Sequence, residues 1–362
     1  MRIVLLALAA LALAPATLAG QQRWTAVDVG FLHACALDDG GRAFCWGEND
    51  AGMLGAATPV RCPEHSHGHG NECGPGPSAA PIAVAGGHRF RSIRAGYAIT
   101  CGVTVEEALY CWGVPFGLRP DGPEPFAPGR RFRAVEENER TVCGIRPEGG
   151  ATCFKNRGGW KEETMLEGTS LVSLDLTDYP MDVVCAVADG GRARCRGDNR
   201  YGQLGVEGDA KDFTEVAGGL TFTAIRTSET YTCGLAAGGE AYCWGEGGAL
   251  ASSSGERYPC DTRRCRRAPE RVAGDLRFRA IDRGNEEMCG LTEAGEVYCW
   301  GSDGKAAPAA DGARFRAISG GYHQWCGIRV DGALACWEWN KPGSLALVPP
   351  PATASAGAHT GH

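Results

Sequence analysis

The 362-residue sequence lacks the motifs by which common enzyme active sites are recognised. It contains no G-x-S-x-G, no H-E-x-x-H and no glycine-rich loop that would cradle a phosphate. Acidic residues outnumber basic ones, 43 to 36, so we expect no basic stripe that could neutralise a nucleic-acid duplex. After the first 20 residues, no run of 18 apolar residues could cross a membrane as a helix. We therefore predict no catalytic residue, no cofactor, no nucleic-acid partner and no transmembrane anchor in the mature chain.

The first 20 residues differ in composition from the rest of the chain. One Arg precedes an apolar run from Ile3 to Ala14, and the small residues Thr17 and Ala19 stand at −3 and −1 of a cleavage site after Ala19. This is the pattern of a secretory signal peptide; a retained membrane anchor is the alternative. We expect residues 1–19 to be removed and the protein to be secreted, or held in the periplasm or at the cell surface.

Cysteine is the residue that the chain has in excess, 18 in all. In an oxidising compartment a large, even set of cysteines indicates disulfides, whereas in a cytosol it would indicate metal or redox chemistry. Fourteen cysteines form seven pairs with nine residues between the members, and this constant spacing predicts seven structural repeats. The pairs are Cys35 and Cys45, Cys101 and Cys111, Cys143 and Cys153, Cys185 and Cys195, Cys233 and Cys243, Cys289 and Cys299, and Cys326 and Cys336.

Each pair lies in a segment with the pattern of a β-hairpin: short, rich in aromatic and aliphatic residues, and interrupted by turn residues. If the two cysteines face each other, the connecting loop has three residues. Its last position favours a left-handed residue, and it holds Gly in six repeats and Glu107 in the second. Opposed residues at a non-hydrogen-bonded position lie about 4.5 Å apart, within disulfide reach. We therefore predict one cross-strand disulfide per repeat.

The same register places a strand glycine opposite a tyrosine in three repeats. A glycine covered by a cross-strand aromatic ring is a known pairing device, so we expect the tyrosines to cover the glycines. The expected pairs are Gly102 with Tyr110, Gly234 with Tyr242, and Gly290 with Tyr298.

Two further strands complete each repeat. One lies upstream of the hairpin, where an aromatic residue or Leu is followed three residues later by an aliphatic one. The other is indicated by Pro81–Val84, Thr214–Val216 and Pro269–Val272. Four short antiparallel strands repeated seven times predict an all-β fold, a seven-bladed β-propeller over residues 20–350.

The ends of the chain bear on ring closure. The first repeat lacks a preceding fourth-strand segment, so we predict that Ser344–Val348 supplies this strand and closes the ring beside repeat one. Residues 351–362 are of low complexity, and we expect a disordered tail there.

Two loops carry a recognisable signature. Asp198–Gly205 reads DNRYGQLG, Glu48–Gly55 reads ENDAGMLG, and four hairpins end in C-W-G. Over about residues 22–348 these motifs resemble the repeats of the regulator of chromosome condensation family. The cysteine-bearing version is similar to exported bacterial members and to the extracellular repeats of plant crinkly receptor kinases. The secreted β-lactamase inhibitory protein II type resembles the chain in fold and compartment. The resemblance implies a seven-bladed propeller, and it carries over no exchange-factor activity because none of the residues for that activity maps here.

Repeats three and four depart from this signature. They have Phe154 and Arg196 where the other repeats have Trp after the second Cys. Specialisation and drift are the two explanations, and we favour drift.

One face of the propeller is the candidate binding surface. Because neighbouring strands are antiparallel, the loop before each first Cys and the connection after each hairpin emerge on the same face, together with the insertions at residues 48–80 and 246–268. Aromatic residues on loops of a rigid scaffold are typical of recognition surfaces, whereas packing between blades is the structural alternative. The predicted binding residues are Phe31, His33, Tyr97, Tyr179, Tyr231, Tyr322 and His323.

The first insertion is rich in histidine. His65, His67 and His69 lie between Cys62 and Cys73, and imidazoles in this arrangement are candidate metal ligands. A disulfide-tied loop with exposed histidines is the alternative, and the even cysteine count favours it.

The second insertion has a cysteine pair without histidine, Cys260 and Cys265. Between them, Arg263 and Arg264 are candidates to bind an acidic partner or a glycan anion. Simple solvation of such a cluster is the alternative.

Three classes of function follow from this sequence. The leading hypothesis is an exported, monomeric, non-catalytic propeller that binds an extracytoplasmic protein, with inhibition as one form of that role. The second is a carbohydrate-binding or surface-structural protein. The third is an enzyme in the central channel, whose residues would come from several blades.

Overall fold

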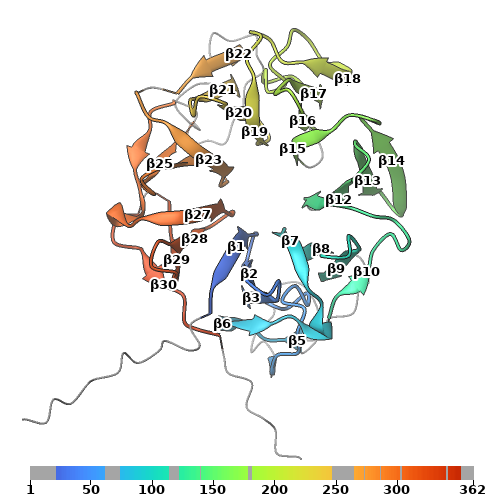
Figure 1. Ribbon diagram of the computed structural model, residues 1–362, viewed down its shortest axis with the longest axis vertical. Coiled ribbons are helices and arrows are strands. Elements are labelled where there is room, and N and C mark those ends of the chain that lie inside the picture. The colour runs from blue at the N-terminus through green and yellow to red at the C-terminus, as the bar shows by residue number, and fades with distance from the viewer. Residues whose placement is uncertain are drawn as a thin grey trace, which may run out of the picture.

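The computed structural model describes residues 22–61, 74–113, 122–138, 140–177, 182–246, 265–272, 274–285, 287–301, 304–339 and 341–351. These residues form seven four-stranded antiparallel sheets around a central axis (Figure 1). The predicted seven-bladed β-propeller is therefore confirmed.

Each blade follows the chain from an inner strand at the axis to an outer strand (Figure 1). Blade one has β1 (Trp24–Val29), β2 (His33–Asp38), β3 (Ala43–Gly47) and β6 (Ser78–Ala83); blade two has β7 (Phe90–Ala95), β8 (Ile99–Thr104), β9 (Leu109–Gly113) and β10 (Glu124–Pro125). Blade three has β11 (Ala134–Glu137), β12 (Thr141–Ile145), β13 (Ala151–Asn156) and β14 (Trp160–Met165); blade four has β15 (Leu171–Leu176), β16 (Val184–Ala188), β17 (Ala193–Gly197) and β18 (Ala210–Glu215).

The remaining blades repeat the arrangement. Blade five has β19 (Phe222–Thr227), β20 (Tyr231–Ala236), β21 (Ala241–Glu246) and β22 (Cys265–Arg271); blade six has β23 (Phe278–Arg283), β24 (Met288–Thr292), β25 (Val297–Trp300) and β26 (Ala307–Pro308). Blade seven has β27 (Phe315–Gly320), β28 (Trp325–Arg329), β29 (Leu334–Trp337) and β30 (Ala346–Leu347). A small ribbon of β4 (Val60–Arg61) and β5 (Gly74–Pro75) and two 3-10 turns, η1 (Ala85–Gly87) and η2 (Ala310–Gly312), complete the elements of the described residues.

One cross-strand disulfide in every blade confirms the predicted cysteine pairing. The two cysteines of each pair are Cα partners on the second and third strands of their blade. The seven bonds join Cys35 to Cys45, Cys101 to Cys111, Cys143 to Cys153, Cys185 to Cys195, Cys233 to Cys243, Cys289 to Cys299, and Cys326 to Cys336. The spacing of nine residues therefore sets the register of the central hairpin throughout the ring.

The turn of the central hairpin also follows the prediction. The last residue of the connecting loop has a positive φ in all seven blades, including Glu107 at 70°. In most blades its carbonyl also accepts a hydrogen bond from the next blade, as Gly239 O does from Phe278 N at 2.7 Å. The turn therefore ends a hairpin and joins two blades.

The covering of the strand glycines differs from the prediction. Gly102 is opposite Tyr110, as expected, but a Cβ on Gly102 would lie 2.6 Å from Cδ1 of Phe90 on the inner strand. The phenylalanine ring, not the tyrosine, therefore occupies the space above the glycine. The sequence carries this coupling, because the two repeats without Phe at the inner strand have Ala in place of Gly: Trp24 goes with Ala36, and Leu171 with Ala186.

The ring closes between blades seven and one. The predicted C-terminal strand is present as β30, but it pairs with β29 and completes blade seven. Blade one does not lack a fourth strand, since β6 fills that place. The prediction assigned the fourth strand to the wrong repeat, because each outer strand follows its own hairpin in the chain. Arg316 Nη2 donates to Trp24 O at 2.6 Å, and Val348 packs against the core between these blades.

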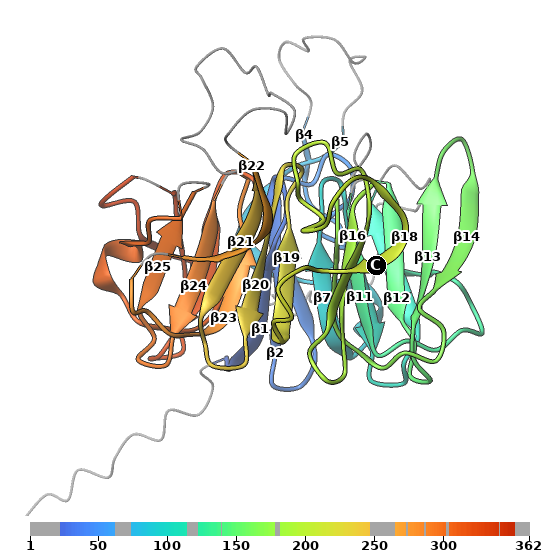
Figure 2. The same cartoon turned by 90° about the horizontal axis from the view of Figure 1, so that it is seen from above.

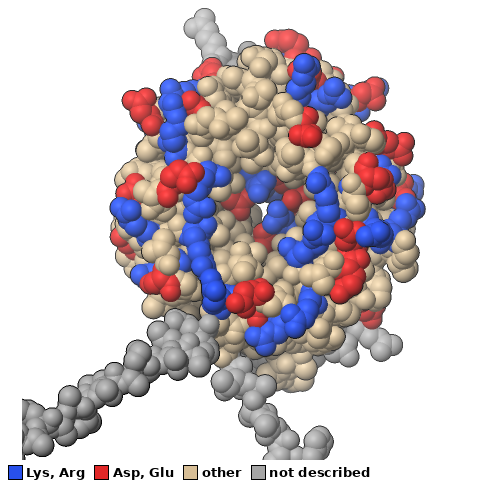
Figure 3. All heavy atoms as spheres, in the orientation of Figure 1, with Lys and Arg blue, Asp and Glu red and all other residues tan. Residues whose placement is uncertain are grey.

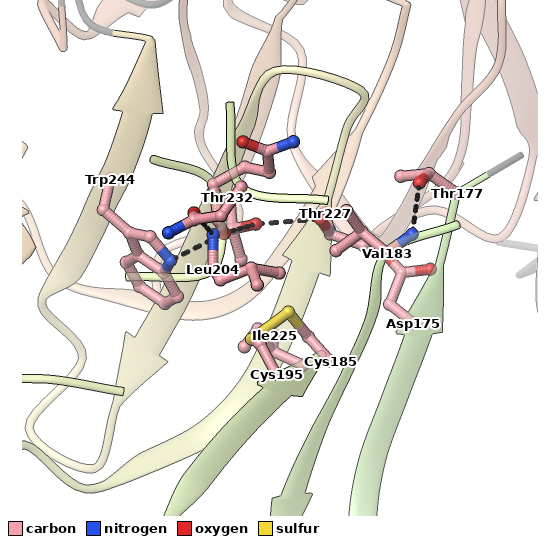
Figure 4. Close-up of a disulfide and its surroundings, with 12 residues drawn as sticks. Asp175, Thr177, Val183, Cys185, Cys195, Leu204, Ile225, Thr227, Thr232 and Trp244 are labelled. Carbon is pink, nitrogen blue, oxygen red and sulfur yellow. Dashed lines mark hydrogen bonds between the residues drawn. A yellow bond between two sulfur atoms is a disulfide. The ribbon is translucent and has the colours of Figure 1, made fainter. Parts of the chain in front are cut away.

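The signature loops lock one blade to the next. The Asn199 side chain accepts a hydrogen bond from Leu204 N and donates to two carbonyls of the same loop, which fixes its shape. Gln203 O then accepts hydrogen bonds from Trp244 Nε1 at 2.9 Å and from Thr232 Oγ1 at 2.8 Å, both in the next blade (Figure 4).

The copy in blade one behaves in the same way. Met53 O accepts hydrogen bonds from Trp112 Nε1 and Thr100 Oγ1 of blade two. The motif that carries the family resemblance is thus a structural lock.

The disulfides bear on the compartment. All fourteen cysteines of the seven pairs are buried or nearly so, and seven disulfides are typical of an oxidising, extracytoplasmic environment. Within the described ranges, no helix has the length and apolarity that crossing a membrane requires.

Candidate functional site

Three inner loops from neighbouring blades meet on the face from which β4 and β5 project (Figure 2). They connect β27 to β28, β1 to β2 and β7 to β8, and each begins with a glycine followed by an aromatic residue. Phe31 N donates to Gly96 O at 2.9 Å, and Tyr322 N donates to Gly30 O at 3.3 Å. A Cβ on Gly30 would collide with the carbonyl of Gly96. Glycine therefore lets the loops approach closely enough to form backbone hydrogen bonds with one another.

The aromatic side chains of these loops form a continuous row. The Phe31 ring lies 4.4 Å from Tyr97 and 4.5 Å from Tyr322, centroid to centroid, and His323 lies 5.1 Å from Phe31. Tyr97 is 47% exposed and Tyr322 48%, and His323 and Leu32 are exposed beside them. We call these five residues the aromatic row. The structure thus brings together four of the residues that the sequence analysis selected.

Two other selected residues are not on this surface. His33 is 1% exposed and Tyr231 6%, because each is the first residue of its strand and points between blades. His33 Nε2 is 2.7 Å from Thr100 Oγ1 in blade two, and burial lowers the pKa of His33 to about 3. For both residues the structural alternative, packing between blades, is the correct one.

Several predicted residues lie outside the described part of the chain. They are Tyr179, Arg263 and Arg264, the histidines His65, His67 and His69, and the cysteines Cys62, Cys73 and Cys260. Cys265 is described only as the backbone start of β22. Among the residues that the structure does describe, no group of His, Cys, Asp or Glu could hold a metal ion.

A ring of charged side chains lies in the central channel. Its members share one position, directly after the aliphatic residue of each inner strand, and the space-filling view shows both charges inside the central hollow (Figure 3). In chain order they are Asp28, Arg94, Glu136, Asp175, Arg226 and Asp282, and the uncharged Ser319 holds this position in blade seven.

The ring residues mostly bind the next blade. Arg94 donates to Asp28 at 3.0 Å and to both oxygens of Glu136 at 2.7 and 2.8 Å, and Arg226 donates to Asp282 at 2.7 Å. Backbone amides of a following blade donate to the carboxylates of Asp28, Asp175 and Asp282. These charges are therefore engaged in joining blades.

Burial shapes the acidity of the ring. It raises the pKa of Asp28 to about 6, although Arg94 acts in the opposite direction. Burial also favours a raised pKa at Asp282, but the Arg226 guanidinium outweighs it and holds that pKa below the usual value. A carboxyl with a raised pKa could act as a general acid, but here both Asp28 oxygens already accept hydrogen bonds from the neighbouring blade.

The sequence analysis missed the residues that build the row. Gly30, Gly96 and Gly321 fix the loops, and Leu32 extends the exposed surface. The signal was present as Gly followed by Phe or Tyr, four residues before the first Cys, in repeats one, two and seven only.

Comparisons with known proteins agree with this fold. A family model described as the regulator of chromosome condensation (RCC1) repeat matches residues 24–52, which span β1 to β3 and the start of the signature loop. No curated protein matches the sequence.

Solved propellers superpose on most of the chain. Prp20p from Saccharomyces cerevisiae has a TM-score of 0.63 at 15% identity, covering 83% of this chain and 80% of its own. Human WBSCR16 has a TM-score of 0.66 at 15% identity, covering 82% and 88%. The CRINKLY WD40 ectodomain of the Arabidopsis thaliana receptor kinase ACR4 has a TM-score of 0.57 at 18% identity, covering 90% and 100%. At these identities the likeness establishes the fold alone.

Proposed function

Because the chain is an RCC1-like seven-bladed β-propeller, we propose that it is an exported, non-catalytic protein-binding module that holds its partner through the aromatic row. The single observation that carries this proposal is the contact of two exposed tyrosine rings with the half-buried Phe31 ring, on loops joined to one another by backbone hydrogen bonds. Large, rigid aromatic side chains supply contact area with little loss of conformational entropy, and they dominate the energy of many protein interfaces.

The comparisons support a binding role by precedent. The Prp20p structure was described together with its binding to Gsp1p and histones, and the ACR4 propeller is the ectodomain of a receptor kinase. These precedents make it reasonable that a propeller of this shape presents a face to another molecule. Inhibition of an exported enzyme is the special case in which the partner is itself an enzyme.

The two other candidate functions have less support. The rings of the row are tilted by 35° and 49° to one another, so they do not form the coplanar platform on which a flat polysaccharide would stack. In the channel, the described carboxylates accept hydrogen bonds from Arg side chains or backbone amides of neighbouring blades, which leaves little room for an acid–base pair.

A pull-down with matched variants tests the proposal. The oxidised chain is the bait against the envelope and secreted fractions of its source. Tyr97→Ser with Tyr322→Ser removes two exposed rings, and Val105→Ser with Val330→Ser removes two similarly exposed apolar side chains from hairpin turns on the opposite face. We expect the unmodified chain and the valine variant to capture the same stoichiometric protein.

The purified partner then gives the affinity. The tyrosine variant should bind it on the order of tenfold to a hundredfold more weakly. Equal capture by the tyrosine variant would refute the site. Failure of every bait to bind protein, with a glycan-array signal in its place, would refute the function.

A further inference from the structure

The opposite face of the propeller carries arginines in a repeated pattern. An aromatic residue or Leu stands at the start of the inner strand in six blades and two residues before β11 in blade three. The two positions that flank it hold nine arginines and no acidic residue over the seven repeats. No lysine occurs there either. The arginines are Arg23, Arg89, Arg91, Arg131, Arg133, Arg277, Arg279, Arg314 and Arg316.

These arginines occupy a continuous arc. They belong to blades six, seven, one, two and three, whereas blades four and five have Ser, Val or Thr at the same positions. Figure 3 shows this face: basic side chains surround much of the central hollow, and the upper part, where blades four and five lie in Figure 1, is largely uncharged near the hollow. We call this set the arginine arc. A net charge of −7 for the whole chain conceals it.

Blade packing alone does not require the arc. In blade five, Phe222 N donates to Gly191 O of blade four at 2.7 Å without any flanking arginine. The same backbone bond joins Phe90 N to Gly41 O at 2.7 Å where arginines are present. The join between blades therefore forms equally well with or without them.

Much of the positive charge in the arc has no carboxylate beside it. Arg91 and Arg131 share the single carboxylate of Glu107, while Arg277 and Arg314 each pair with a Glu of the preceding blade. The other five, within the described part of the chain, form no ion pair: Arg23, Arg89, Arg133, Arg279 and Arg316.

Three of these five arginines are nevertheless held in place. Arg89 donates to Gly40 O, Arg279 donates to Arg316 O and two other carbonyls, and Arg316 donates to Trp24 O. A guanidinium has five N–H donors, so a carbonyl bond orients the group while leaving both its charge and several donors available. Oriented guanidinium groups suit sulfate and phosphate, which they bind with two parallel hydrogen bonds.

We propose that the arginine arc binds a sulfated or phosphorylated polysaccharide laid around the channel mouth. The exclusive use of arginine fits tetrahedral oxyanions, and the span of five blades fits a polymer better than a single ion. Nucleic acid is disfavoured, because the flanking positions provide no aromatic ring on which bases would stack. This surface lies on the face opposite the aromatic row, and the proposal does not depend on the function proposed there.

Binding of fluorescent heparin fragments to the oxidised chain tests this proposal, with anisotropy as the readout from about 50 to about 300 mM salt. Arg23→Gln with Arg133→Gln removes two arc residues that make no ion pair, so folding should be unaffected. Arg192→Gln with Arg267→Gln is the control, because both residues lie on outer parts of blades and pair with Glu.

We expect the arc variant to bind at least about tenfold more weakly than the control and to lower the slope of log Kd against log salt by about two. Equal affinities of the two variants would overturn the proposal, as would the absence of binding at the lowest salt concentration. Single-stranded DNA of matched charge that binds as tightly as heparin would also overturn it, in favour of a nucleic-acid partner.

Discussion

Two seams between neighbouring blades solve the same packing problem with opposite chemistry. Between blades four and five, the indole of Trp244 is fully buried and donates to Gln203 O of the preceding blade. Between blades three and four, the same position holds Arg196, whose guanidinium donates to Glu163 of the preceding blade at 2.6 Å. At this position the first seam therefore has a buried indole with one hydrogen bond, and the second has an ion pair.

The difference follows from the loop that the preceding blade offers. Blade four has the signature loop, whose fixed shape presents a carbonyl to the indole N–H. Blade three has only residues 157–159 between β13 and β14, which is too short to present one. A buried indole N–H without an acceptor is destabilising, so tryptophan suits only the first seam. Arg196 is therefore matched to the neighbouring blade, and random drift is not required to explain why it replaces the usual tryptophan.

The largest loss of stability is expected when the indole is removed from the seam between blades four and five. Trp244→Ala should lower the free energy of unfolding by about 3–5 kcal/mol, because it leaves a cavity and removes one of the two hydrogen bonds to Gln203 O. Trp244→Phe keeps most of the volume and should cost about 1–2 kcal/mol. Thermal unfolding of the oxidised protein measures both, and equal losses would show that the hydrogen bond rather than packing dominates.

The next largest effect is expected from pH, through the contact of His33 in blade one with Thr100 in blade two. His33 is neutral in the fold with a pKa near 3, while the unfolded value is 6.5, so stability should fall as pH drops below about 6.5. At about pH 5 the loss from this residue is about 2 kcal/mol relative to pH 7. Asp28, whose pKa rises from 3.8 to about 6, acts in the opposite direction over that interval.

The comparison with His33→Gln separates these two effects. Glutamine does not titrate, so the variant should lack the His33 loss and retain the gain from Asp28. Denaturant unfolding at about pH 5 and about pH 7 measures both chains. Parallel pH profiles for the two chains would contradict the assignment.

A third test removes the side-chain hydrogen bonds that fix the signature loop of blade four. Asn199→Ala removes one hydrogen bond to Leu204 N and two to loop carbonyls, and we expect a loss of about 1–3 kcal/mol. Asn156→Ala is the matched change in the short connection of blade three, where the side chain accepts one exposed hydrogen bond. Its cost should stay within about 0.5 kcal/mol. Similar costs would mean that the loop does not act as a lock.

The smallest effect belongs to the polar seam. Glu163→Gln should cost about 1 kcal/mol or less, because the carboxylate is partly exposed and its pairing with Arg196 and Lys155 is screened by water. The cost should shrink in about 1 M salt, whereas the cost of Trp244→Phe should not change. Equal stability of the unmodified chain and the Glu163→Gln variant at low salt would show that the pair contributes nothing measurable.

The repeats could be predicted from the sequence because local rules define them. Cysteine spacing and the left-handed turn position set the register of the hairpin, and Glu107 follows the rule without being glycine. What could not be predicted depends on which blade lies beside which. His33 and Tyr231 resemble exposed loop residues in the sequence, but a neighbouring blade buries them. The assignment of β30 failed for the same reason, since only the assembled ring shows where an outer strand pairs.

The aromatic row illustrates the same limit. Phe31, Tyr97 and Tyr322 were selected one by one as loop aromatics, yet their contact depends on residues far apart in the chain. Only the closing of blade seven on blade one brings residue 322 beside residue 31. The arginine arc could not be predicted from the net charge of the chain, because net charge averages over both faces of the propeller.

Every one of the seven blade disulfides joins residues ten positions apart within one blade. None of these seven joins a blade to its neighbour, so within the described residues the blades are held to one another by apolar packing, indoles, ion pairs and backbone hydrogen bonds. If the oxidised chain were pulled by its two ends, the first resistance would come from a seam, and the blades would separate one after another. Each hairpin would survive as a closed loop that the force cannot straighten, and the molecule would stretch in steps, each step the length of one blade less its crosslinked loop.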